Sequence, residues 1–350
     1  MTAQTIHILG LGNIGCYMAV ALRSLPPPPA APAVTVLLRP ETLPHFRHRV
    51  SLTSLASGST QTATGFVAES SSPSSPSSSS SPIRHLIVAT KSYQLHDALR
   101  PLLPRLSRST TIVLTQNGLP ALPADLFPRA DAMPRCFATV TTHGIYSSAT
   151  ERFAVTLAGV GSVVVGPAGP VSAASPGSDS DSDSWLLEQL ARTGAEIVHT
   201  PSELQCRQRA KLAVNAAINP LSALHGVRNG QLLGIPTAVD AMRAVVAEFV
   251  AVARPDGGYG CPADQEKEQD ELWQVVERVV HVTRNNYSSM LQDVRAGRRT
   301  EVREINGWIA ARGRQLGLPC PQNRRLVAEI EALEARPHRA GPPSSPPPAS

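Results

Sequence analysis

The chain has 350 residues, of which 42% are hydrophobic, enough for two domains with a substantial core. It has no run of about 18 or more apolar residues, so we expect no transmembrane helix. Aromatic residues make up only 4%, which counts against a base-stacking surface for nucleic acid. The net charge of +5 is a mild excess that suits an anionic small molecule.

The cysteine and histidine patterns argue against a metal centre. The five cysteines form no Cys-x-x-Cys pair, and their odd number disfavours a disulfide scaffold. The histidines include no His-Glu-x-x-His motif, and we expect His143 to be a hydrogen-bonded structural residue rather than a base. The first residues lack a basic leader and run directly into a strand pattern. We therefore expect no secretory signal and a cytoplasmic location, with the mitochondrion as the alternative.

Short apolar strands alternate with helical segments over the first 200 residues. Strands are predicted at 5–9, 33–38, around Val67, at 86–89 and 111–114, twice within 153–165, and at 196–199. Helices are predicted at 16–25, 94–103 and 185–193. This alternation is typical of an α/β domain with a parallel, doubly wound sheet.

From residue 201 the pattern changes to long amphipathic helices, which predicts an all-helical second domain. The helices are expected at 202–223, 236–253, 264–295, 303–316 and 323–335. The domains are therefore predicted to cover residues 1–200 and 201–336. Low-complexity segments at 70–81 and 172–184 are expected to be flexible loops, and residues 337–350 a disordered Pro/Ser tail.

A glycine motif lies between the first strand and the first helix. Gly10-Leu11-Gly12-Asn13-Ile14-Gly15 has the spacing G-x-G-x-x-G in the strand–turn–helix context that confirms a dinucleotide-binding loop. The first glycine permits the tight turn, the second lets the backbone approach a pyrophosphate, and the third lets helix and strand pack closely. The alternative is an ordinary glycine-rich turn.

Polar residues follow three of the predicted strands, at the edge where such sheets bind ligands. Arg39 stands where an acidic residue would read the ribose 2′-hydroxyl of NAD, so it favours NADP. Lys91 and Asn117 follow the fourth and fifth strands. The alternatives are a solvated arginine, a solvated loop lysine and a turn asparagine.

In the helical half, Lys211, Asn215 and Asn219 repeat every four residues and lie within an arc of about 80° on one helix face. Their neighbours are apolar, which indicates a buried helix whose polar groups need partners; the alternative is a solvated edge. A second polar cluster, 285–290, interrupts a long helical pattern. Taken singly, Ser289 and Glu301 would be ordinary polar residues.

Together these motifs resemble the ketopantoate reductase (2-dehydropantoate 2-reductase) family from Ile6 to about Leu333. The stretches that carry the resemblance are 10–15, 90–91, 117–118, 139–144, 211–215, 218–221, 288–293 and 300–307. The resemblance implies a Rossmann-type domain joined to an all-α domain of the 6-phosphogluconate dehydrogenase C-terminal type. It further implies NADPH-dependent reduction of 2-dehydropantoate to (R)-pantoate, on the route to pantothenate and coenzyme A, by a monomer or homodimer.

The resemblance also implies residue roles. Lys211 looks like the family's general acid and Glu301 like its essential carboxylate. The implied substrate-binding residues are Asn117, Asn215, Asn219, Asn286 and Ser289. The implied NADP-binding residues are Gly10, Leu11, Gly12, Asn13, Ile14, Gly15, Arg39, Lys91, Asn117 and Glu301.

Two other functions fit the same pattern. One is a different NAD(P)-dependent oxidoreductase of 2-oxo or hydroxy acids with this architecture. The other is a non-catalytic NADP-binding sensor, which would need the glycine motif and Arg39 but not Lys211 and Glu301 together. Their joint presence argues against the sensor.

Overall fold

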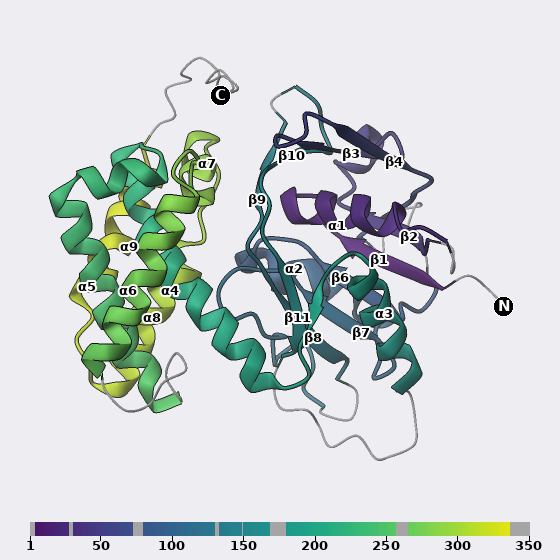
Figure 1. Ribbon diagram of the computed structural model, residues 1–350. Helices are drawn as coiled ribbons and strands as arrows, with labels where there is room; N and C mark the ends of the chain where they lie inside the picture. Colours follow the sequence, from purple (N-terminus) through teal and green to yellow (C-terminus); the bar gives the residue numbers. More distant parts are fainter. Residues whose placement is uncertain are drawn as a thin grey trace.

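The computed structural model consists of a sheet domain and a helical domain (Figure 1). It describes residues 4–27, 31–72, 80–129, 133–148, 150–168, 180–256 and 265–336. Most of each low-complexity segment lies outside the described residues, namely 73–79 and 172–179, and so does the tail 337–350. The predicted flexible loops and disordered tail therefore fall largely outside the described residues. None of the described helices has the length and apolar character needed to cross a bilayer.

The sheet domain is built on eight strands in the order β12-β11-β8-β7-β6-β1-β2-β5. Their bounds are β1 Thr5–Leu9, β2 Ala33–Leu38, β5 Val67–Ser70, β6 His85–Val88, β7 Thr111–Leu114, β8 Arg135–Thr141, β11 Val163–Pro167 and β12 Glu196–Ile197. The six strands from β5 to β8 are parallel, and β11 pairs antiparallel with β8. Chain order reverses between β1 and β6, the switch point where such sheets bind dinucleotides. The predicted doubly wound sheet is therefore confirmed.

Helices cover both faces of this sheet, which explains why its central strands are buried and mostly apolar. Helices α1 (Asn13–Arg23) and α3 (Ser180–Arg192) pack on one face, and α2 (Leu95–Leu99) on the other. The helix expected at 94–103 is α-helical only over α2 and is flanked by 3₁₀ turns at Ser92–Gln94 and Arg100–Arg105. The second turn contains Pro101 and Pro104, which cannot continue an α-helix. Helix α3 starts inside a segment expected to be a loop.

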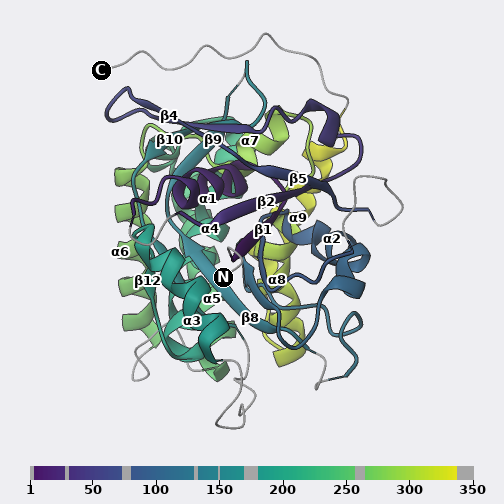
Figure 2. The same ribbon diagram turned by 90° about the vertical axis from the view of Figure 1, so that its right-hand side faces the viewer.

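A second, four-stranded sheet is the main feature that the sequence did not predict. Its order is β4-β3-β10-β9, with bounds β3 Arg49–Ser54, β4 Thr60–Thr64, β9 Gly144–Ser147 and β10 Ala154–Gly159. It contacts α1 and covers that helix on the side away from the main sheet (Figure 2). Only the strand pattern of β10 was recognised, because β3 and β4 are rich in Ser and Thr and have no apolar run.

The second domain contains the predicted long helices. Their bounds are α4 Pro201–His225, α5 Pro236–Ala253, α6 Gln265–Val282, α7 Ser289–Arg295, α8 Val302–Leu316 and α9 Pro321–Glu334, with 3₁₀ turns at Asn229–Gly234 and Arg254–Asp256. A further 3₁₀ turn, Leu43–His45, lies in the sheet domain. The single helix expected at 264–295 is wrong. The chain leaves helix after α6 and starts α7 anew at Ser288, whose hydroxyl accepts the Leu291 N–H at 3.1 Å.

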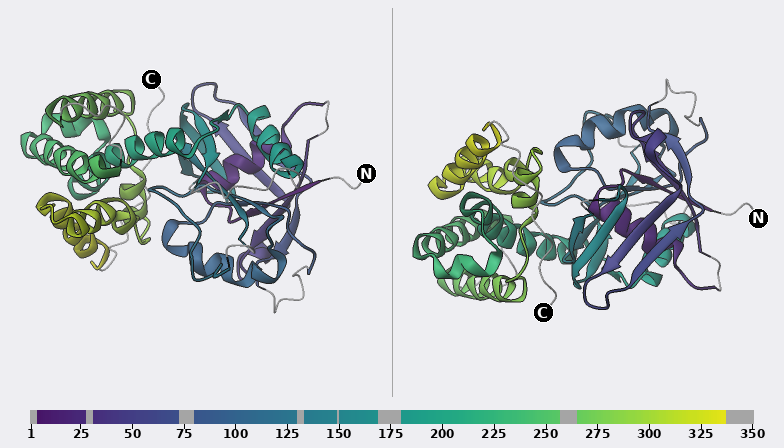
Figure 3. Two further views of the ribbon diagram at one scale, coloured as in Figure 1. Left: turned by 90° about the horizontal axis from the view of Figure 1, so that it is seen from below. Right: turned by 90° about the horizontal axis from the view of Figure 1, so that it is seen from above.

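Helix α4 joins the two domains. Thr200 caps the start of the helix. The first part of α4 packs on β8 and β11, and the rest of the helix lies among α5, α7 and α9 (Figure 3). The apolar residues form one core cluster in the helical domain and two on the faces of the sheet. Lys211 lies midway along α4, so the helix carries this residue to the junction between the domains.

Candidate active site

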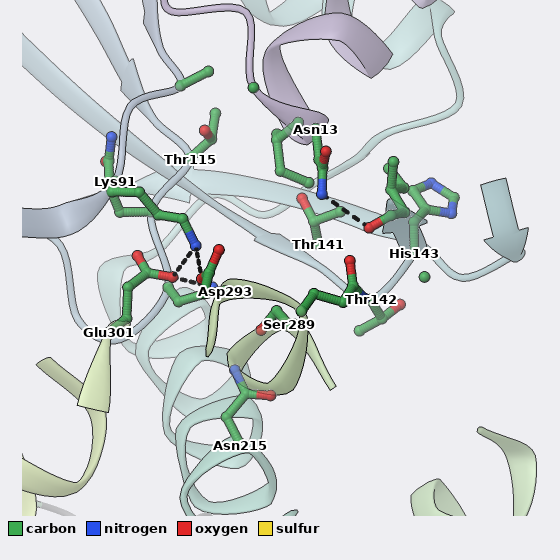
Figure 4. Close-up of a pocket in the computed structure, with 18 of the residues that line it drawn as sticks. Asn13, Lys91, Thr115, Thr141, Thr142, His143, Asn215, Ser289, Asp293 and Glu301 are labelled. Carbon is green, nitrogen blue, oxygen red and sulfur yellow. Dashed lines mark hydrogen bonds and ion pairs between the residues drawn. The ribbon is translucent and has the colours of Figure 1, made fainter. Parts of the chain in front are cut away.

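A cleft of about 1530 Å³ lies between the carboxyl ends of the main strands and the helical domain. Ordinary small-molecule sites are about 300–1,000 Å³, so this cleft has room for a dinucleotide and a second small ligand. Every residue predicted to act at the site lines it, except Gly15, which lies behind the loop. Figure 4 shows the part where the two domains face each other.

The glycine loop has the shape that a pyrophosphate requires. Gly10 has a φ of 91°, a conformation that side chains disfavour. A Cβ on Gly15 would lie 2.1 Å from the Gly10 carbonyl oxygen, so only glycine lets α1 approach the strand. A Cβ on Gly12 would meet nothing closer than 3.9 Å, which leaves its backbone open to a ligand at the N-terminus of α1. These residues fit the phosphates of a nicotinamide dinucleotide.

The Asn13 side chain is engaged elsewhere. Its Nδ2 donates to the Ile145 carbonyl at 3.1 Å, and its Oδ1 accepts from the Ser147 hydroxyl at 2.6 Å. Both partners belong to β9, so this asparagine fastens the glycine loop to the second sheet. What Asn13 can offer an anion is its backbone N–H, together with the backbone of Leu11 and Ile14 beside it.

Arg39 lies directly after β2, at one end of the cleft. Its side chain is 71% exposed, and its Nε lies 3.3 Å from Glu41 Oε1. Such an exposed ion pair is weak, so the guanidinium is free to turn toward a ligand phosphate.

A chain of hydrogen bonds joins the two domains at the other end of the cleft. Lys211 Nζ donates to Asn117 Oδ1 at 2.8 Å, and Asn117 Nδ2 donates to Glu301 Oε2 at 2.9 Å. Lys211 comes from α4, Asn117 follows β7, and Glu301 directly precedes α8. The residues predicted to be the general acid and the essential carboxylate are thus bridged by one amide.

Glu301 is buried, with a side chain 5% exposed, and is surrounded by donors. Its Oε1 accepts the Ser92 hydroxyl at 2.5 Å and the Ser92 N–H at 3.3 Å, and Lys91 Nζ lies 3.4 Å from Oε2. Burial alone would raise the pKa of Glu301. The Lys91 charge and the hydrogen bonds from Ser92 and Asn117 outweigh burial and hold that pKa below its usual value. Glu301 is therefore an anion at neutral pH.

The environment of Lys211 has the opposite effect. Burial among the apolar residues of α4 lowers the pKa of Lys211 to about 8, with the Glu301 charge opposing the decrease. An amine with a pKa near neutrality can both give and take a proton at physiological pH.

Lys91 lies between two carboxylates of the helical domain. Its Nζ is 2.7 Å from Asp293 Oδ2 and 3.4 Å from Glu301 Oε2, as the dashed lines in Figure 4 mark. Burial lowers the pKa of Lys91, but the two carboxylates together outweigh burial and raise that pKa. Lys91 is therefore a fixed cation at the domain junction.

The remaining predicted residues lie along the helical wall. Asn215, Asn219, Asn286 and Ser289 all line the cleft, and Ser289 is an exposed residue at the start of α7. The Asn286 amide reaches across to the second sheet, where a Cβ on Gly144 would lie only 3.1 Å from its Nδ2.

Two residues of the polar network had no role in the sequence analysis. Ser92 directly follows Lys91 after a predicted strand, and this position alone could have indicated that Ser92 faces the ligand-binding edge of the sheet. Asp293 lies within the motif 288–293, but nothing local to that helix indicates a partner about two hundred positions away.

His143 is hydrogen-bonded, as expected, and it also lines the cleft. Its Nδ1 accepts the Gly161 N–H at 2.9 Å, which leaves Nε2 to bond the Tyr17 hydroxyl at 2.9 Å. Burial lowers the pKa of His143. Within the described residues, no group of three or more His, Cys, Asp or Glu side chains could hold a metal ion.

Sequence comparison links both domains to one family. Residues 6–170 match the family "Ketopantoate reductase PanE/ApbA", and residues 203–334 match its C-terminal domain. A 2-dehydropantoate 2-reductase of Vibrio cholerae is 33% identical over 249 residues, which cover 71% of this chain and 77% of that protein. A probable 2-dehydropantoate 2-reductase of Schizosaccharomyces pombe is 26% identical over 342 residues, or 93% and 95% of the two chains.

Solved structures share the fold. A PanE/ApbA family ketopantoate reductase of Ralstonia eutropha superposes with a TM-score of 0.72 at 25% identity, covering 95% of this chain and 98% of that one. A D-mandelate dehydrogenase solved with NADH and anilino(oxo)acetate gives 0.74 at 20% identity, with the same coverage. The chain therefore belongs to the ketopantoate reductase family of NAD(P)-dependent oxidoreductases.

Proposed function

We propose that this chain reduces 2-dehydropantoate to pantoate with NADPH, and that Lys211 is its general acid. The observation that carries the proposal is the hydrogen-bonded series from Lys211 through Asn117 to Glu301, which spans the domain junction inside the cleft. A protein that only sensed NADP would need the glycine loop but no amine and carboxylate set against each other here. Relatives named 2-dehydropantoate 2-reductase support the choice of substrate.

The polar groups of the cleft suit the chemistry of a 2-oxo acid. A bound nicotinamide would supply a hydride to the carbonyl carbon, and negative charge would develop on the carbonyl oxygen. Lys211 would stabilise that charge and transfer its Nζ proton to the oxygen. Asn117 holds the amine in place through its Oδ1. Glu301 would orient the substrate hydroxyl.

The substrate carboxylate needs neutral donors in addition to the cation. Asn215, Asn219 and Asn286 offer amide N–H groups on the helical wall, and Ser289 offers a hydroxyl at the N-terminal turn of α7. Together with Lys211, these donors would bind the carboxylate and exclude water when the cleft is filled.

The pKa of Lys211 predicts the pH dependence of the reaction. Only the protonated amine can donate, and its pKa is lowered to about 8. We expect kcat/KM for reduction to be level up to about pH 7, to be halved near pH 8 and to approach a tenfold fall per pH unit above it. The reverse oxidation needs the neutral amine and should gain rate over the same range. A pH profile in both directions checks this, and a reduction rate that stays level to pH 10 would contradict it.

A single assay tests the function. Oxidation of NADPH by the full chain would be followed at 340 nm with 2-dehydropantoate and with a panel of other 2-oxo acids. We expect 2-dehydropantoate to have the highest kcat/KM. A higher value for another 2-oxo acid would move the assignment to a different oxidoreductase of this architecture, and no turnover with any of them would favour the NADP sensor.

Arg39 is proposed to select NADP. Replacing Arg39 with alanine should raise KM for NADPH by about 10–100-fold, the equivalent of one hydrogen bond to a charged group, and leave KM for NADH nearly unchanged. Glu41→Gln is the matched control, because it breaks the same 3.3 Å ion pair but keeps the guanidinium. Equal losses with both cofactors would show that Arg39 does not read the 2′-phosphate.

A further inference from the structure

The Lys91 ammonium is shared unequally between two carboxylates. Its distance to Asp293 Oδ2 is 2.7 Å, against 3.4 Å to Glu301 Oε2, and both carboxylates are 5% exposed. We propose that Asp293 is a positioning residue of this reductase: by holding Lys91, it keeps the Glu301 charge directed at Lys211 and the substrate. This inference rests on the proposed role of Lys211.

Asp293 is well placed for this role. It lies in α7, four residues after Ser289, and its Oδ1 also accepts from Arg298 Nε at 2.9 Å. Lys91 follows β6 in the other domain. One carboxylate thus connects the helix that carries Ser289 with the sheet edge. Because an ammonium has three donors and two are taken, Lys91 retains one N–H for a bound dinucleotide.

Glu301 is where Lys91 would go if Asp293 lost its charge. It is the other carboxylate in contact with Lys91, and it already accepts from Ser92 and Asn117. A closer Lys91 would neutralise Glu301 and compete with Asn117, whose other end holds Lys211. Lys211 would then lose much of the charge that supports its protonated form.

The surrounding charges do not compensate. The titratable and charged groups around this cluster are Lys91 and Tyr93 after β6, Lys211 on α4, Asp293 on α7, and Arg298, Arg299, Glu301 and Glu304 around the start of α8. Arg299 faces Glu304 and the ring of Tyr93. Removing the Asp293 charge therefore takes one ion-pair partner from both Lys91 and Arg298, and leaves Lys91 with Glu301.

The composition of the chain makes a direct test practical. Its only lysines are Lys91, Lys211 and Lys267. Lys267 is 68% exposed on α6, and its ammonium lies 3.9 Å from Glu271, so it serves as an internal reference. With lysine labelled by ¹³C at Cε, the full chain gives three signals, which single Lys→Arg variants assign. The titration of Lys211 is then followed without any assay of activity.

The direction in which the Lys211 titration midpoint moves separates a positioning role of Asp293 from a merely structural one. In Asp293→Asn we expect the Lys211 midpoint to fall by about half a pH unit or more, because Lys91 moves onto Glu301 and offsets the charge that supports the protonated amine of Lys211. A merely structural defect would let water reach Lys211 and raise the midpoint. Asp293→Glu, which keeps the charge, and Glu331→Gln, which breaks the Arg303–Glu331 pair outside the lining of the cleft, should leave the Lys211 midpoint in place.

Kinetics give a second measure of the same coupling. We expect Asp293→Asn to lower kcat/KM about tenfold and to move the alkaline limb of its pH profile downward, with Asp293→Glu restoring most of the loss. In a Lys91→Met background the further loss from Asp293→Asn should nearly vanish. An unchanged or raised Lys211 midpoint, or the same tenfold loss without Lys91, would overturn the proposal.

The outcomes also separate this proposal from the proposed function. If the wild-type chain does not reduce 2-dehydropantoate, the substrate assignment fails, but the NMR titration still decides the role of Asp293. If reduction is observed and the Lys211 midpoint does not fall in Asp293→Asn, the function stands and the positioning role fails. Should Asp293→Asn fail to fold, Asp293→Ser removes the same charge and is expected to lower the Lys211 midpoint for the same reason.

Discussion

Replacing Lys211 with alanine is expected to lower kcat by about 10²–10⁴ while the affinity for NADPH stays nearly the same. The variant removes the proton donor and the cation that would face the developing oxyanion. It does not touch the glycine loop or Arg39, which are proposed to hold the dinucleotide. The measurements are steady-state kinetics of reduction and the binding of NADPH by fluorescence titration.

Lys267→Ala is the matched control for this prediction. It removes the same side chain from an exposed site on α6, where the ammonium lies 3.9 Å from Glu271. Activity within a few-fold of wild type is expected. If Lys211→Ala turned over as fast as this control, Lys211 would have no place in the reaction.

Glu301→Gln is expected to lower kcat/KM by about 10²-fold, the upper part of the range for hydrogen bonds to a charged group. The amide is nearly the same size, so the effect is mainly the loss of charge. Ser92 and Asn117 would each direct a donor at a group that is no longer an anion. Glu301 is also the group that opposes the effect of burial on the pKa of Lys211, so that pKa should drop below about 8.

The pH profile checks this second part. The alkaline limb of kcat/KM should move to lower pH in Glu301→Gln, because Lys211 loses its proton earlier. Glu304→Gln is a suitable control, since Glu304 is a neighbouring carboxylate paired with Arg299 and lies outside the lining of the cleft. A limb that stays in place in Glu301→Gln would mean that the two groups are not coupled as the geometry suggests.

The sequence by itself determined the sheet domain's plan and the ligand-binding edge. The glycine motif is readable because its requirements are local: a φ of 91° at Gly10 and a 2.1 Å contact between Gly10 and a Cβ at Gly15 arise within six residues. Strand and helix periods are local too, and most predicted elements lie within a few residues of the observed ones. The exceptions are the break before α7, strand β8 of the main sheet, and strands β3, β4 and β9 of the second sheet, none of which was predicted.

Only the tertiary structure decided which side chains are partners. Asn13 belongs to the glycine motif, but its amide is bound to β9; Lys91 follows a strand end, but its amine is held by Asp293 of the other domain. Hydrogen bonds and ion pairs act over about 3 Å, and the residues they join are about 130 and 200 positions apart in the chain. Such contacts depend on how the second sheet covers α1 and how α4 sets one domain against the other, which no local pattern encodes.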